Sequence, residues 1–188
     1  MHLWLARHAQ PLIAAGICYG VTDVAADDAL TRTAAQSLAD VLPKDTVCSV
    51  SPLQRCQQLA AALADIRPDL SLKPAICTDH RLAEMNFGHF EGQPWSAIPK
   101  ADIDAWTASF GNHLFGGSES ANDMLARVAA ALQDRREQSR PDSNILWITH
   151  AGVIRSVSLL LQGITQLDTA TQWPREVHEF GKWVRVEI

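Results

Sequence analysis

The fold is decided by residues 47–63, which have the sequence VCSVSPLQRCQQLAAAL. Val47 to Val50 forms a short apolar run of the kind that makes a buried strand. Ser51 and Pro52 then predict a helix start, with serine as the N-cap and proline at the first helical position. After them, Leu53, Cys56, Leu59, Ala60 and Leu63 repeat at helical spacing. This stretch therefore predicts strand, tight turn and helix, the repeating unit of an α/β fold.

The same alternation continues on both sides of this stretch. Further strands are expected at Leu3–Ala6, Asn144–Ile148 and Trp183–Ile188, and further helices from Thr31 as N-cap to Pro43, from Ser118 or Ser120 onward, and at Ala151–Leu161. Strands that alternate with helices predict a three-layer α/β/α sandwich with a mostly parallel central sheet.

Length and composition favour one domain over residues 1–188, because 188 residues with 47% apolar content can bury a full core. Residues 74–117 are rich in glycine, proline and tryptophan, with one weak helical stretch near Ala101–Phe110. They predict a long insertion that covers the active site. The net charge of −5 gives no basic footprint, so neither nucleic acid nor an anionic membrane surface is expected as a partner.

Four cysteines stand among apolar neighbours without a CxxC pair, which favours buried reduced thiols over a disulfide framework. A cytoplasmic location is expected on that ground. The residues from Met1 to Arg7 carry no basic leader pattern and predict a first strand, and no apolar run is long enough to span a membrane.

Polar pairs stand where predicted strands end. Arg7-His8 follows the first strand and Thr149-His150 follows Asn144–Ile148, while Arg55 lies in the first turn of the helix after Val47–Val50. Ligands of open α/β sheets bind outside the carboxyl ends of strands, and the start of a helix favours an anion. These ends therefore predict a phosphate site.

Four motifs in order resemble the histidine phosphatase superfamily, branch 1, which includes the phosphoglycerate mutases. They are Arg7-His8-Ala9, Ser51-Pro52-Leu53-Gln54-Arg55-Cys56, Leu82-Ala83-Glu84-Met85-Asn86-Phe87-Gly88-His89-Phe90-Glu91-Gly92 and His150-Ala151-Gly152. The resemblance implies a phosphoglycerate mutase-like fold and a phosphatase for small phosphate monoesters. Cys18 to Asp23 and Gly117 to Ser120 are similar to the α-ribazole phosphatase subgroup, which acts late in cobalamin synthesis and takes α-ribazole 5′-phosphate.

Roles for these residues follow from the charge and proton demands of phosphoryl transfer. Arg7 and Arg55 can each donate two parallel hydrogen bonds to phosphate oxygens, and His150 is expected to add a third positive donor. His8 attacks as a neutral imidazole, because cations beside it disfavour its protonated form. Glu84 stands at the acid position of the family and would protonate the leaving oxygen, then deprotonate water.

The family resemblance adds Tyr19 and Gly20 as substrate-binding residues. No cofactor and no metal are expected, because the seven histidines show no ligand spacing. Whether the chain forms a homodimer is left open. A structural role is favoured for Glu91 and Glu119, and the role of His89, which lies in the Glu84 loop, is left open. Trp106 and Phe110 would either pack in the core or line the leaving-group pocket.

The sequence departs from the family at three positions. Ala9 replaces a glycine, Gln10 replaces a glutamate, and Ala14 stands near the place of a phosphate-binding asparagine.

Two alternative functions are weighed. A phosphoglycerate mutase would need basic residues in the insertion, yet Pro94 to Gly117 contains only Lys100 as a cation. A non-catalytic phosphate-binding module is disfavoured by the intact set Arg7, His8, Arg55, Glu84 and His150.

Overall fold

The computed structural model describes residues 1–70, 77–176 and 178–188. Within these ranges the chain forms a five-stranded sheet in the order β3-β2-β4-β1-β5. The strands are β1 (His2–Arg7), β2 (Val47–Val50), β3 (Cys77–Thr78), β4 (Asn144–Thr149) and β5 (Trp183–Glu187). Only β5 runs antiparallel to its neighbour among these strands, so the predicted mostly parallel sheet is confirmed.

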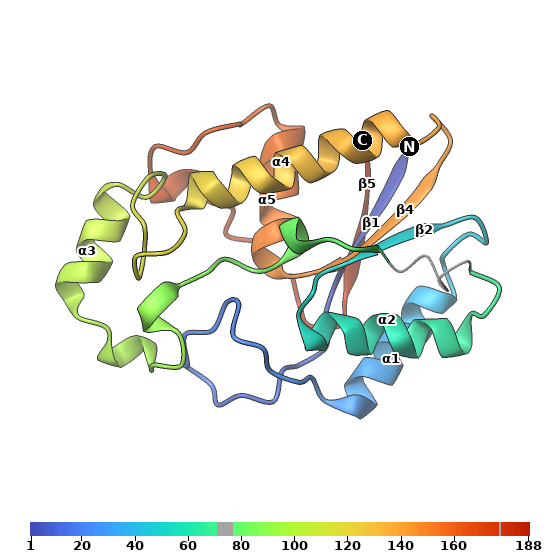
Figure 1. Cartoon of the computed structure of the whole chain (residues 1–188), viewed down its shortest axis with the longest axis horizontal. Coiled ribbons are helices and arrows are strands. Elements are labelled where there is room, and N and C mark those ends of the chain that lie inside the picture. Colours follow the sequence, from blue (N-terminus) through green and yellow to red (C-terminus); the bar gives the residue numbers. More distant parts are fainter. Residues whose placement is uncertain (71–76, 177) are drawn as a thin grey trace.

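Helices cover both faces of this sheet, as Figure 1 shows. Because side chains of a strand alternate between faces, Trp4 and Ala6 pack with α1 (Asp28–Ala39) and α2 (Gln54–Ile66). Leu3 and Leu5 point to the other side, where they pack with α4 (Ala121–Gln138) and α5 (Ala151–Leu161). The three-layer α/β/α arrangement is therefore confirmed.

Two predicted helix starts are wrong, in both cases because the hydroxyl has another partner. The N-cap of α1 is Asp27, whose carboxylate accepts from the amide of Leu30 at 2.8 Å, and the Thr31 hydroxyl donates to the backbone oxygen of Asp27. The N-cap of α2 is Leu53, because the Ser51 hydroxyl bonds to a distant side chain. Ser120 does cap α4, in a capping box with Asp123.

The described part of the predicted insertion, residues 77–117, contains α3 (Lys100–Ala108) and short 3-10 turns at His80–Leu82, Gly88–Phe90 and Trp95–Ala97; a fourth turn, at Ala170–Gln172, lies outside it. In Figure 1, α3 lies apart from the sheet at the left edge. Aromatic side chains pack against one another in this segment, and the stacked rings of Trp106 and Phe115 have centroids 4.2 Å apart. Residues 74–76, the predicted start of the insertion, lie outside the described residues.

The prediction of buried cysteines is wrong for Cys77, which is exposed on the two-residue edge strand β3 that the sequence pattern did not reveal.

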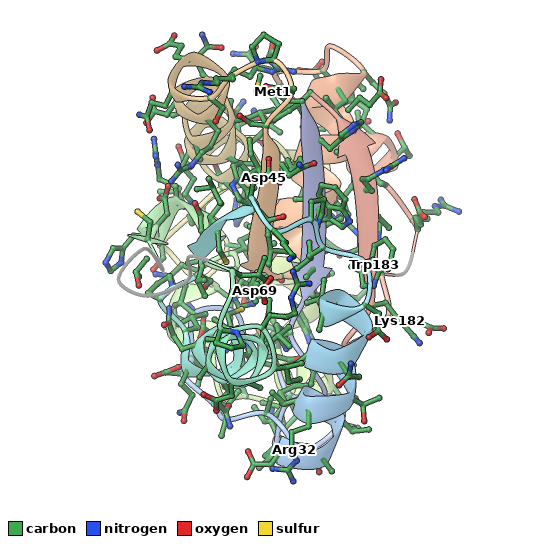
Figure 2. All side chains as sticks on the ribbon, turned by 90° about the vertical axis from the view of Figure 1, so that its right-hand side faces the viewer. Met1, Arg32, Asp45, Asp69, Lys182 and Trp183 are labelled. Carbon is green, nitrogen blue, oxygen red and sulfur yellow. The ribbon has the colours of Figure 1, made fainter. Side chains whose placement is uncertain are left out.

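The last strand is tied to the first helix by a side-chain hydrogen bond. Figure 2 labels Trp183 at the start of β5, where its indole donates to Ser37 of α1 at 3.2 Å. No helix in the described ranges is long and apolar enough to cross a membrane.

Candidate active site

The register of the sheet brings the two strand-end histidines together. Arg7 pairs with Thr149 across β1 and β4, so His8 and His150 follow side by side, with ring centroids 5.0 Å apart. The amide of Ser51 donates to the carbonyl of Ile148 at 3.0 Å, which continues β2 alongside β4. The first turn of α2 therefore delivers Arg55 to the same place.

His8 is fixed as a neutral imidazole with a defined tautomer. Its Nδ1 lies 2.7 Å from the carbonyl oxygen of Ala9, and because a carbonyl only accepts, Nδ1 carries the proton and Nε2 a lone pair. Burial, followed by the charges of Arg55 and Arg7, lowers the pKa of His8 from 6.5 to about 3. Neutrality was expected from the neighbouring cations, but burial is the larger cause.

The guanidinium of Arg7 is held against an aromatic ring. Its Cζ lies 3.7 Å from the centroid of the Phe180 ring, and Nη1 donates to the backbone oxygen of His178 at 2.5 Å. The Nε of Arg7 is buried without a partner in the described part of the chain. Arg7 therefore keeps a donor available for a phosphate oxygen.

Arg55 is completely buried, and backbone oxygens orient it. Its Nη2 donates to Gly20 at 2.6 Å, Nη1 donates to Thr22 at 2.8 Å, and Nε lies 3.3 Å from the Nε2 of His8. A Cβ at Gly20 would lie 1.7 Å from the carbonyl oxygen of Met85, so only glycine fits. Gly20 therefore lies behind Arg55, not in the cavity, and positions the arginine.

Glu91 anchors the segment whose carbonyls hold Arg55. Its carboxylate accepts from the backbone amides of Val21, Thr22 and Phe87 at 2.9, 2.5 and 3.0 Å. The structural role expected for Glu91 thus has a clear geometric basis.

Glu84 lines the same cavity as His8 and lies against the start of α5. Its carboxylate accepts from the amides of Met85 at 3.0 Å and Gly152 at 3.2 Å. A Cβ at Gly152 would lie 2.1 Å from Glu84 Oε1, which explains the glycine of the His-Ala-Gly motif. The backbone of Glu84 is held by Arg127, which forms an ion pair with Glu119 at 2.6 Å.

His150 is fully buried beside His8, and its surroundings oppose a charge. Its Nε2 lies 2.7 Å from the Ser51 hydroxyl, and Nδ1 has no partner in the described residues. Burial, followed by the neighbouring His8 and Arg55, lowers the pKa of His150 well below 6.5. The expected third positive donor is therefore wrong, because His150 is neutral.

A cavity of about 400 Å³ opens in front of these groups. Its polar lining comes from Arg7, His8, Tyr19, Arg55, Glu84 and Arg155, and its apolar lining includes Met85, Phe87, Trp95, Trp106, Phe110, Met124 and Trp173. Two roles were considered for Trp106 and Phe110, packing in the core or lining the pocket. Both residues line the cavity. His89 is exposed and outside the lining.

The departures from the family pattern leave the site formed. Ala9 is buried and does not adopt a positive φ, so its side chain fits without strain. The backbone oxygen of Gln10 accepts from Asp27, the cap residue of α1, and Ala14 is exposed. Among the described residues no cluster of histidine, cysteine, aspartate and glutamate could hold a metal ion.

Sequence reasoning missed Phe180, Arg155, Trp95 and Trp173. None of the four carries a motif. Arg155, Trp95 and Trp173 are identified by their place in the cavity lining, and Phe180 by its contact with the Arg7 guanidinium. Arg155 stands one helical turn after Ala151, and this spacing from the second histidine was the only signal.

The chain matches the family described as Histidine phosphatase superfamily (branch 1) over residues 3–186. A protein of Hydrogenobacter thermophilus, provisionally named phosphoserine phosphatase 2, is 30% identical over 117 residues, or 61% of this chain. The match spans about half of that relative, 54% of its length.

Solved structures show the same fold. The protein TTHB049 of Thermus thermophilus superposes with a TM-score of 0.70 at 26% identity, covering 99% of this chain and 93% of that one. A mycobacterial glucosyl-3-phosphoglycerate phosphatase gives a TM-score of 0.76 at 21% identity, covering 98% and 88%.

Proposed function

The chain belongs to branch 1 of the histidine phosphatase superfamily, and we propose that it is a phosphatase for small phosphate monoesters with His8 as nucleophile. One observation carries the proposal. The lone pair of His8 Nε2, the guanidinium groups of Arg7 and Arg55, and the carboxylate of Glu84 meet in one cavity. Two fixed cations match a phosphate dianion, and the carboxylate can move the proton that the leaving oxygen needs.

The reaction takes two displacements. First, His8 Nε2 attacks phosphorus, the bond from phosphorus to the ester oxygen breaks, and the Glu84 carboxyl group gives its proton to that oxygen. Water then attacks the phosphohistidine, Glu84 takes a proton from the water, and the N–P bond breaks to release phosphate. Arg7 and Arg55 hold the equatorial oxygens in both steps.

Hydrolysis is favoured over mutase transfer by the insertion. Lys100 is the only lysine or arginine between Pro94 and Gly117, and it pairs with Asp104 at 2.5 Å on the exposed helix α3. It does not line the cavity. Residues 94–117 therefore contribute no lysine or arginine to the cavity that could bind a second phosphate or carboxylate group.

For the substrate, we propose α-ribazole 5′-phosphate first, followed by a broader range of metabolites. The rings of Trp106 and Phe110 stack 5.4 Å apart along the cavity wall, which suits the flat benzimidazole base of that compound. A second candidate class, monoesters that carry a carboxylate, is favoured by Arg155. This arginine lines the cavity and donates to the backbone oxygen of Glu176 at 3.1 Å.

A panel of monoesters assayed in one buffer tests the proposal, with α-ribazole 5′-phosphate, phosphoserine and nitrophenyl phosphate included. Trp106→Leu should raise KM for α-ribazole 5′-phosphate about tenfold and leave phosphoserine nearly unchanged. Arg155→Gln should lower kcat/KM for phosphoserine about tenfold and spare α-ribazole 5′-phosphate. Absence of turnover with every monoester, or turnover that persists in His8→Ala, would refute the phosphatase.

A further inference from the structure

Ser51 belongs to the motif at the start of α2, yet it neither caps that helix nor lines the cavity. Asp23, from a distant loop, instead accepts from the first helical amide, that of Gln54, at 2.7 Å. The Ser51 side chain is completely buried and lies 2.7 Å from Nε2 of His150. The motif serine is thus available to act on the second histidine.

The direction of this hydrogen bond follows from the other contacts of Ser51. Its Oγ accepts from the amide of Leu53 at 3.4 Å, so its own proton needs an acceptor. Nε2 of His150 lies 2.7 Å from this hydroxyl and is a strong acceptor. The Cys56 thiol, 3.5 Å from the same nitrogen, has the carbonyl of Thr149 as an acceptor for its own proton. If Nε2 carried the proton instead, the buried hydroxyl of Ser51 would have the sulfur of Cys56, a weak acceptor, in place of a ring nitrogen, and Nδ1 of His150 would be a buried acceptor without a donor.

We infer that Ser51 donates its hydroxyl proton to Nε2 of His150 and thereby fixes His150 as the neutral tautomer protonated at Nδ1. Ser51 is then a positioning residue. His150 does not itself line the cavity, but it lies beside His8, which does, and its Nδ1–H has no protein partner among the described residues. This N–H is the group left to donate to a phosphate oxygen held at His8. That a phosphate oxygen accepts this hydrogen bond rests on the proposed phosphatase function.

This assignment says which groups of the site are charged and which are neutral. Arg7 and Arg55 supply two positive charges, while His8 and His150 are neutral donors or nucleophiles. Arg155 and Glu84 also line the cavity, so a neutral His150 adds no further positive charge that would hold the product phosphate. A charged His150 would hold the ground state and the product more tightly than turnover needs.

Nitrogen-15 NMR of histidine-labelled protein at pH 7 tests the tautomer without any reference to activity. The His150 signals are assigned by their loss in His150→Gln. We expect Nδ1 to have a protonated-type shift and Nε2 an unprotonated-type shift. The opposite pattern, or both nitrogens protonated, would overturn the inference.

Variants of Ser51 test whether its hydroxyl fixes the tautomer of His150. Ser51→Ala should give averaged tautomer signals and raise the inhibition constant of inorganic phosphate about threefold to tenfold, and Ser51→Thr should restore both. Ser156→Ala is the matched control, because this buried serine bonds to the carbonyl of Gly152 at 2.9 Å and not to His150. An unchanged His150 spectrum in folded Ser51→Ala would overturn the role of Ser51.

The two proposals fail separately. A correct tautomer in a protein that hydrolyses no monoester would refute the phosphatase and leave the Ser51–His150 contact standing. Active enzyme with the Nε2-protonated tautomer would refute this inference alone.

Discussion

The burial of His8 should make the protein less stable as the pH falls, and His8→Asn should remove that effect. The pKa of His8 is about 3 in the folded protein, against 6.5 for an ordinary histidine. Between these values the unfolded chain binds a proton that the folded protein does not, so the free energy of unfolding falls as pH drops below 6.5. Asparagine at position 8 keeps a polar side chain but cannot titrate.

The size of the effect follows from the same two values. Each pKa unit corresponds to about 1.4 kcal/mol, and pH 5 lies 1.5 units below 6.5, so His8 should cost the folded state about 2 kcal/mol at pH 5. The cost is nearly absent at pH 7. It grows further until the pH reaches about 3, where folded His8 also takes up its proton.

Urea unfolding followed by circular dichroism at pH 5 and pH 7 measures this difference for wild type and His8→Asn. The wild type should lose about 2 kcal/mol more than the variant between the two pH values. His89→Asn, at an exposed histidine, is the control and should keep the wild-type difference. Equal losses in wild type and His8→Asn would refute the assignment of His8 as a buried neutral imidazole.

Three further predictions concern turnover. His8→Ala should abolish hydrolysis, and brief mixing of wild type with labelled substrate should leave acid-labile phosphate on the protein; near wild-type turnover in this variant would exclude the nucleophile. Glu84→Gln should slow alkyl phosphates by about two to four powers of ten, while the burst of nitrophenol from an aryl phosphate, which needs no acid, falls far less. Equal burst losses for both substrates would assign Glu84 to positioning alone. Gly152→Ala should lower kcat about a hundredfold, because its Cβ would lie 2.1 Å from Glu84 Oε1, with circular dichroism unchanged; a fully active variant would contradict this packing.

Sequence patterns predicted the main strands and helices closely, since buried strands and amphipathic helices depend on short-range periodicity. Val47–Val50 and Ala151–Leu161 agree with the structure residue for residue. Edge strand β3 was missed, because two exposed residues carry no apolar pattern. The cap of α1 was wrong because Asp27 and Thr31 are both good cap residues one helical turn apart, and the apolar pattern does not choose between them. The cap of α2 was wrong because Ser51 bonds to His150, a contact that arises only on folding.

The candidate site divides in the same way. Residue types at the ends of strands and in the family motifs were sufficient to name Arg7, His8, Arg55, Glu84 and His150, since each motif is local. The charge on His150 and the place of Gly20 were not predictable, because burial and close packing arise only when distant segments meet.

By itself, the sequence determined the alternation of strands and helices, the family, and the groups that would handle a phosphate. The tertiary structure alone decided how those groups act. It set the register that pairs Arg7 with Thr149, the burial that keeps His8 neutral, and the contact of Ser51 with His150. Propensity and periodicity act over a few residues, whereas protonation and orientation depend on the solvent and partners that folding removes or supplies.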